Sequence, residues 1–161
     1  GRYLFFDQNN TRIRSLLVLL ERQLGGEPLS ELCLGEVFPS QRTPVCLLSE
    51  QGEELVPAAM RWGFTHPTQK RLVINARSET APSRKKMLFT LPDQAMLCMA
   101  GFYHLEADGP HFVIMTCPAL PELSAIHDRM PVVLNEEGAL RYCQGEDQLH
   151  CASYLQVRPA D

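Results

Sequence analysis

The sequence lacks several features that would assign it to a familiar class of protein. None of its apolar runs approaches the ~18 residues that a membrane-spanning helix needs, and its N-terminal stretch GRYLFFDQNN turns polar too soon for a signal peptide. It contains no CxxC pair, no cysteine and histidine at zinc-binding spacing, and no G-x-S-x-G motif. We therefore expect no membrane association, no metal site and no cofactor.

The composition describes one globular domain without a strong bias of charge. A chain of 161 residues can bury a real core, and 45% hydrophobic with 21% charged residues is ordinary for a soluble protein. The net charge of −4 argues against a protein coated in basic residues, but it leaves room for a local basic groove. Positive side chains do gather in one part of the chain, namely Arg61, Lys70, Arg71, Arg77, Arg84, Lys85 and Lys86.

The cysteines are scattered rather than paired at a recognisable spacing, and they are Cys33, Cys46, Cys98, Cys117, Cys143 and Cys151. Two of them, Cys46 and Cys98, lie in apolar, strand-like runs where a reduced thiol behaves as a small hydrophobic group. This usage favours a reduced, intracellular protein, in the cytoplasm or nucleoid of a bacterium or in the nucleus of a eukaryote.

Apolar periodicity predicts many strands and a few helices. We expect helices over residues 11–24, 118–127 and 135–145; Asn9 or Asn10 would cap the first, Gly25 and Gly26 would end it, and Asn135 would cap the last. The apolar face of the first helix would comprise Ile13, Leu16, Leu17, Leu19, Leu20 and Leu24. Strands are expected over 87–92, 95–105, 111–117 and 130–134, with a turn at 106–110 and a hairpin over 43–64 that turns at 50–53.

Because strands and helices do not alternate regularly, this order predicts an α+β fold. We expect a compact single domain over residues 1–161, with a mostly antiparallel sheet or barrel-like core and peripheral helices.

Residues 72–80, with the sequence LVINARSET, join an apolar strand to a cluster of polar groups. In an extended chain Asn75, Arg77 and Glu79 would project from the same face. Desolvating such groups is costly unless they pair with each other or with a ligand. The pattern therefore indicates a site, and the alternative is a polar strand end within a turn.

Other polar or aromatic residues stand beside strand ends: Arg2 next to the terminus, Trp62 after Arg61, and His127 and Arg129 before the strand at 130–134. An aromatic ring beside arginines suits nucleic acid, since the ring stacks on a base while the cations contact phosphates. Each residue also has a structural interpretation. Trp62 would be buried in the core, His127 would have its hydrogen bonds satisfied within the protein, and Arg129 would be the partner of an ion pair.

The motifs occur in an order that resembles the SOS response-associated peptidase (SRAP) family over almost the whole chain. They are GRY at the start, PSQRTPV at 39–45, MRWGF at 60–64, NARSET at 75–80, MAGFY at 99–103 and IHDRMPVVL at 126–134. The resemblance implies a compact, β-rich α+β fold that recognises abasic sites in single-stranded DNA in the DNA damage (SOS) response. It also implies a covalent thiazolidine link through an N-terminal cysteine, with autoproteolytic processing of the N-terminus.

The resemblance assigns roles to individual residues. Asn75 would orient the cysteine and the sugar, and His127 would shuttle a proton. Phosphates would be held by Arg2 and Arg77, and Trp62 would lie against a neighbouring base. Arg129 and Glu79 would complete the DNA-binding surface, Glu79 as the partner of a nearby arginine. The expected partner is single-stranded DNA that contains abasic sites. We expect the protein to bind it as a monomer and not to associate with a membrane.

The chain departs from the family at two points. The family begins Met-Cys-Gly-Arg, whereas this sequence begins at Gly1, and the family's Gly-Phe-Tyr-Glu-Trp segment, which carries a catalytic glutamate, has no counterpart near Ser83 and Lys86. The stretch GFYHL places His104 at a similar position, but its flanks match a later strand of the family, so we expect a surface residue there. Our expectation is that the biological protein contains both pieces.

Two alternatives to covalent chemistry remain. A chain without the nucleophile and the glutamate would be a non-covalent binder of single-stranded or modified DNA. A peptidase acting on other proteins would follow the family name, but the sequence offers no motif for it.

Overall fold

The computed structural model describes residues 3–4, 11–25, 31–77, 86–91, 96–121, 124–125 and 127–146. These residues form two helices and twelve strands, in the order β1 (Tyr3–Leu4), α1 (Thr11–Gln23), β2 (Glu36–Val37), β3 (Arg42–Leu48), β4 (Leu55–Trp62), β5 (Phe64–Thr65), β6 (Leu72–Val73), β7 (Asn75–Arg77), β8 (Lys86–Leu91), β9 (Leu97–Glu106), β10 (Gly109–Pro118), β11 (Arg129–Pro131), β12 (Val133–Asn135) and α2 (Glu136–Cys143). Neither helix is long and apolar enough to cross a membrane.

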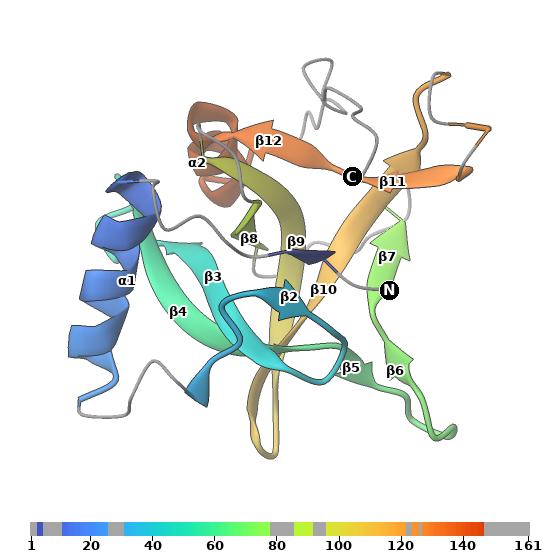
Figure 1. The fold of residues 1–161 in the computed structure, drawn as a ribbon, viewed down its shortest axis with the longest axis horizontal. Helices are drawn as coiled ribbons and strands as arrows, with labels where there is room; N and C mark the ends of the chain where they lie inside the picture. The colour runs from blue at the N-terminus through green and yellow to red at the C-terminus, as the bar shows by residue number, and fades with distance from the viewer. Residues whose placement is uncertain are drawn as a thin grey trace.

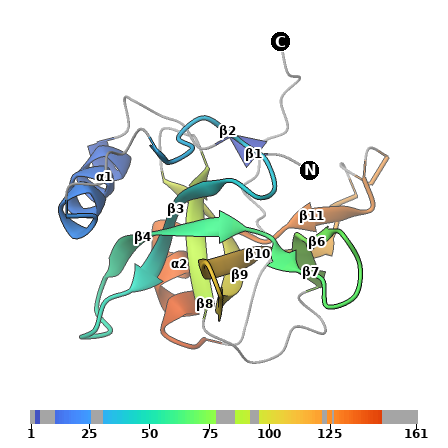
Figure 2. The same cartoon turned by 90° about the horizontal axis from the view of Figure 1, so that it is seen from below.

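Five strands close into a ring. Strand β3 pairs with β4 and with β8, β8 pairs with β9, β9 pairs with β10, and β10 returns to β4. All of these pairs are antiparallel except β10 with β4. The prediction of an α+β domain with a mostly antiparallel, barrel-like core is therefore confirmed, and the ring with its two helices is visible in Figure 1 and Figure 2.

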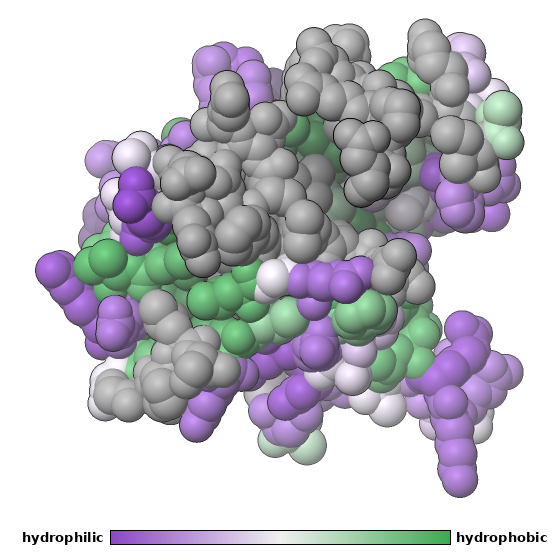
Figure 3. Space-filling view, in the orientation of Figure 1, coloured by the Kyte–Doolittle hydropathy of each residue, from purple (hydrophilic) through white to green (hydrophobic). Residues whose placement is uncertain are grey.

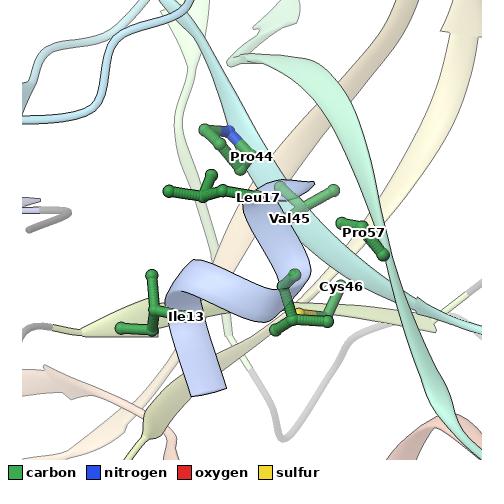
Figure 4. Close-up of a pocket in the computed structure, with 7 residues that line it drawn as sticks. Ile13, Leu17, Pro44, Val45, Cys46 and Pro57 are labelled. Atoms are coloured by element: carbon green, nitrogen blue, oxygen red, sulfur yellow. The ribbon is translucent and has the colours of Figure 1, made fainter. Parts of the chain in front are cut away.

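Helix α1 lies outside the ring, against the hairpin of β3 and β4. Its Ile13, Leu16 and Leu20 are buried. Figure 4 shows Ile13 and Leu17 of the helix beside Pro44, Val45 and Cys46 of β3, where they line a small pocket. The volume of this pocket is only about 10 Å³. Gly25, with φ of +62°, follows the helix, as expected for a residue that ends one. The predicted apolar face was too wide, because Leu19 is 40% exposed, and the predicted caps Asn9 and Asn10 lie outside the described residues.

Strand β10 exchanges its neighbours halfway along its length, and this exchange positions the site. On one side, β4 pairs with His111 and Phe112 and then leaves at Gly63, and β7 takes its place along residues 114–116. On the other side, β9 pairs as far as Ile114, and β11 follows along residues 116–118. Val132 sits at this second fork, where its amide donates to Met115 and its carbonyl accepts from Ala100.

Most of the predicted elements are present. The hairpin over 43–64, the other strands and the helix after Asn135 form, and the Asn135 side chain accepts from the amide of Gly138 at 2.8 Å. The strand predicted over 130–134 is instead divided at Val132 into β11 and β12, which pair with different strands. The helix predicted over 118–127 is wrong for the described residues, which contain only one helix-like bond there, from the Ser124 amide to Leu120. The amide of Ala119 instead donates to the carbonyl of Asp128 at 2.9 Å, so the chain there continues the pairing of β10 with β11.

The cysteines follow the prediction only in part. Cys33, Cys46, Cys98 and Cys143 are free thiols, and Cys46 and Cys98 are buried in the core. Cys117, in contrast, is disulfide-bonded. The expectation of fully reduced cysteines is therefore wrong at this position, which no local spacing in the sequence could indicate.

Candidate functional site

A pocket of about 270 Å³ opens where β7, β10 and β11 run side by side. Its volume lies just below the ~300–1,000 Å³ of sites for drug-sized ligands. It is lined by side chains from five parts of the chain, namely Trp62, Ile74, Asn75, Met99, Ile114, Thr116, His127, Arg129, Met130 and Pro131.

The strand register brings these side chains to one face. Asn75 lies opposite Ile114 in the parallel pair of β7 and β10, and Thr116 lies opposite Pro131 in the antiparallel pair of β10 and β11. Residues opposite one another in a ladder project from the same face, and that face recurs at every second residue. Three strands distant in sequence, β7, β10 and β11, thus contribute to one wall.

Asn75 and His127 are both exposed and line this pocket together. Neither side chain makes a hydrogen bond or an ion pair with a described residue. An amide with two donors and an acceptor, together with an imidazole, is thus available to a ligand. The floor beneath them is apolar, because Met99, Ile114 and Met130 are at most 5% exposed.

Arg129 binds the strand next to it. Its Nη2 donates to the carbonyl of Thr116 at 2.9 Å and to the Thr116 hydroxyl at 3.2 Å, and its Nε lies 3.3 Å from the same hydroxyl. The Thr116 hydroxyl in turn donates to the carbonyl of Ala76 at 3.4 Å. This chain of contacts links β11, β10 and β7 along the pocket wall and places a positive charge there.

Trp62 belongs to the core. It is 2% exposed, and its indole N–H donates to the carbonyl of Ile74 at 3.1 Å. Most of the side chain therefore lies inside the core, and the contact with a neighbouring base stays a prediction. Its buried position agrees with the structural interpretation, and Trp62 also contributes to the lining of the pocket.

The remaining residues that the sequence singles out fall into two groups. Arg77 is exposed and lies opposite Thr116 in the ladder, which puts it on the pocket side of β7 without lining the pocket. Arg2 and Glu79 lie outside the described residues. Thr116 was missed, because a threonine inside an apolar strand has the ordinary signature of a strand residue.

A second polar cluster lies at the opposite end of β10. Glu106 accepts from the amide of Thr65 at 3.0 Å and from its hydroxyl at 2.6 Å, and it lies 2.7 Å from Nε2 of His104. Burial raises the pKa of Glu106, but the hydrogen bonds of Thr65 and His104 outweigh it and lower the pKa to about 2. His104, which also stacks on Phe64 with ring centroids 4.0 Å apart, is thus half-buried rather than fully at the surface.

His111 is buried in the same cluster. Its Nδ1 lies 2.6 Å from the carbonyl of Gly63 and its Nε2 lies 2.6 Å from Asp108. The hydrogen bond with His111 lowers the pKa of Asp108, and the positive charge of Arg61 lowers it further. Glu106, Asp108 and His111 could hold a metal ion, since their ligand atoms lie within 4.8 Å of one another. Because both ring nitrogens of His111 are already bonded, we assign the cluster to fixing the chain at Gly63.

Comparisons with known proteins agree with the fold and with part of the motif pattern. The fold matches the crystal structure of a phage-related protein from Bordetella bronchiseptica, with a TM-score of 0.58 and 20% sequence identity over 89% of this chain and 81% of that one. No curated protein matches the chain. Residues 81–160, which include His127 and Arg129, match the model of the SOS response associated peptidase (SRAP) family. These residues identify an SRAP family domain in this chain.

Proposed function

We propose that the protein recognises an abasic site in single-stranded DNA and, through a cysteine directly preceding Gly1, forms a thiazolidine crosslink with it. The observation that carries the proposal is that the side chains of Asn75 and His127, which bond to no residue in the described part of the chain, lie in one small pocket. The SRAP domain over residues 81–160 gives independent support. Removal of the initiator methionine, the peptidase activity that the family name suggests, would expose the cysteine.

The chemistry needs a primary amine and a thiol on adjacent carbons. The amine adds to the aldehyde of the opened sugar, and loss of one water gives an imine. The thiol then adds to the imine carbon and its proton moves to the nitrogen, which closes a five-membered ring. Holding the amine and thiol beside the aldehyde makes both bond-forming steps intramolecular.

The pocket residues divide the remaining tasks. The Asn75 amide suits a hydroxyl of the sugar, and the His127 imidazole suits proton transfer during ring opening and loss of water. Among the described residues that line the pocket, His127 has the side chain that suits both proton transfers. A volume of about 270 Å³ suits one sugar rather than a whole nucleotide pair.

Exposed cations on β7 and on the turn between β5 and β6 suit the phosphates of a bound strand. Arg77 follows Asn75 on β7, while Lys70 and Arg71 are exposed on the turn between β5 and β6. Figure 3 shows this turn as a hydrophilic projection. Arg129 adds charge inside the pocket. These cations would bind the DNA backbone without reading its sequence.

The test uses the protein with a cysteine directly before Gly1 and a single-stranded oligonucleotide with one abasic site. We expect an adduct that survives denaturing electrophoresis, and we expect none when serine replaces the cysteine or when the oligonucleotide keeps its base. Asn75→Ala and His127→Ala should slow the reaction, the latter by roughly 10²–10⁴-fold as for loss of a general acid or base. Gln144→Ala, at an exposed amide that does not line the pocket, is the matched control and should react normally. Absence of an adduct with the cysteine-bearing protein would refute the covalent reaction.

The same experiment addresses the non-covalent alternative, which the missing glutamate favours. In that case the protein would bind the oligonucleotide without forming an adduct, and the binding would depend on exposed cations such as Arg77. The affinity should then fall steeply with salt concentration, because each neutralised phosphate releases counterions. A covalent adduct, once formed, is insensitive to salt.

A further inference from the structure

We infer that Trp62 is a positioning residue for Asn75, acting through the carbonyl of Ile74; this inference rests on the proposed function. The Ile74 carbonyl accepts two hydrogen bonds, from the indole N–H of Trp62 at 3.1 Å and from the amide of Ile114 at 3.0 Å. That carbonyl belongs to the peptide immediately before Asn75. A planar peptide whose oxygen is held at two points has little freedom to rotate.

The donor itself is rigid. Trp62 ends β4, is 2% exposed, and has both backbone groups bonded: its amide donates to Gln41 at 3.0 Å and its carbonyl accepts from Ser40 at 2.8 Å. Its ring is packed in the core cluster of the barrel. The bond from the indole N–H therefore fixes the start of β7 relative to the wall of the barrel.

Strand β7 needs this second attachment. It has three residues, and within the described part of the chain it pairs only with β10. Asn75 is exposed and its side chain has no partner among the described residues, so its direction depends on the backbone alone. Trp62 holds the peptide before Asn75, while the Thr116 hydroxyl approaches the carbonyl of Ala76 after it at 3.4 Å.

The bond can be removed without removing the ring, because Trp62 is the single tryptophan of the chain. Biosynthetic replacement of tryptophan by benzothienylalanine exchanges the indole N–H for sulfur at this position only. Replacement by 5-fluorotryptophan keeps the N–H and is the matched control. Trp62→Phe is a second variant that also lacks the donor.

The first measurement is the side-chain amide NMR signal of Asn75, assigned by its loss in Asn75→Ala. We expect the signal to shift or broaden in the benzothienylalanine protein and in Trp62→Phe, and to stay near its normal position in the 5-fluorotryptophan protein. An unchanged Asn75 signal in a folded benzothienylalanine protein would overturn the inference. This readout does not depend on any reaction.

The second measurement is the rate of adduct formation by the cysteine-bearing protein. At saturating abasic DNA we expect the benzothienylalanine protein to react roughly 5- to 100-fold more slowly, the range for a small misplacement of a reacting group. The DNA concentration that gives half the maximal rate should stay unchanged. A change that affects only the stability of the fold would alter neither the rate nor this concentration at a temperature well below unfolding. If the unmodified protein forms no adduct, the proposed function fails and the NMR signal alone decides the inference. If it reacts and the benzothienylalanine protein reacts equally fast, the inference fails alone.

Discussion

Replacing Gly63 by alanine tests how tightly the chain is held where β4 leaves β10. Gly63 has φ of +113°, which L side chains rarely adopt, and an added Cβ would lie 2.9 Å from Cδ1 and 3.0 Å from Cβ of Leu72. Gly109 has nearly the same φ, +119°, but an added Cβ there meets nothing within 4 Å. The two glycines therefore separate backbone strain from steric overlap.

The expected costs follow from these geometries. Gly109→Ala should lower the free energy of unfolding by ~1–3 kcal/mol, the usual cost of an unfavourable backbone conformation. Gly63→Ala should bear that cost and a further ~1–3 kcal/mol for the overlap with Leu72. For a domain of this size, each kcal/mol of lost stability lowers Tm by ~2–4 °C, so Gly63→Ala should lower Tm distinctly more than Gly109→Ala.

The assay is urea unfolding followed by the fluorescence of Trp62, the single tryptophan, which directly precedes Gly63. Leu72→Ala in the Gly63→Ala protein should recover part of the loss, and the double-mutant cycle gives the coupling between the two sites. Equal destabilisation by Gly63→Ala and Gly109→Ala, or no recovery in the double variant, would refute the steric argument.

Three further predictions concern groups outside the pocket. Because the pKa of Glu106 is about 2 in the folded protein against an ordinary 4.5, its contribution to stability is complete above about pH 4.5 and is lost as the pH falls toward 2. Glu106→Gln should thus cost ~1.5–3 kcal/mol in urea unfolding at pH 7 and less at pH 3; an equal cost at both would contradict the assignment. Burial raises the pKa of the Cys46 thiol to about 12, so iodoacetamide at pH 8 should leave Cys46 unmodified in native protein and modify it in urea, as read by peptide mass spectrometry. Tyr142→Phe removes a buried bond to the carbonyl of Gly101 and should lower the unfolding free energy by ~1–3 kcal/mol, whereas a neutral effect would mean that this carbonyl finds another donor.

Local sequence signals predicted those elements whose stability is local. The hairpin of β3 and β4 has a turn at Gly52, with φ of +75°, and the helix after Asn135 has a capping side chain in place. Both signals act over a few residues. Leu19 shows where such local signals fail. The helical period places it on the apolar face, but the contact of α1 with the barrel is too narrow to cover it, so it stays exposed.

Features that depend on distant pairing could not be predicted in this way. Nothing in the sequence of β10 indicates that β4 and β7 would share one of its edges, because apolar strand residues suit many partners equally well. The polar pattern of residues 72–80 indicates a site, whereas the joint roles of Asn75 and His127 follow only from the family resemblance. Thr116 and the bond from Trp62 to Ile74 arise only once those partners are in place.

The exchange of partners along β10 gives a physical reason for a polar site on an apolar barrel. Strand pairs that end halfway leave new strand ends at one place, and strand ends are where polar side chains such as Asn75 can stay solvated. The floor under them remains barrel core, with Ile114 only 3% exposed, so a ligand's polar contacts there would form next to a surface of low dielectric and gain strength. A slip of one residue between β7 and β10 would turn Asn75 to the opposite face. Bonds that fix this register, including the one from Trp62, therefore matter to the site as much as the side chains that line it.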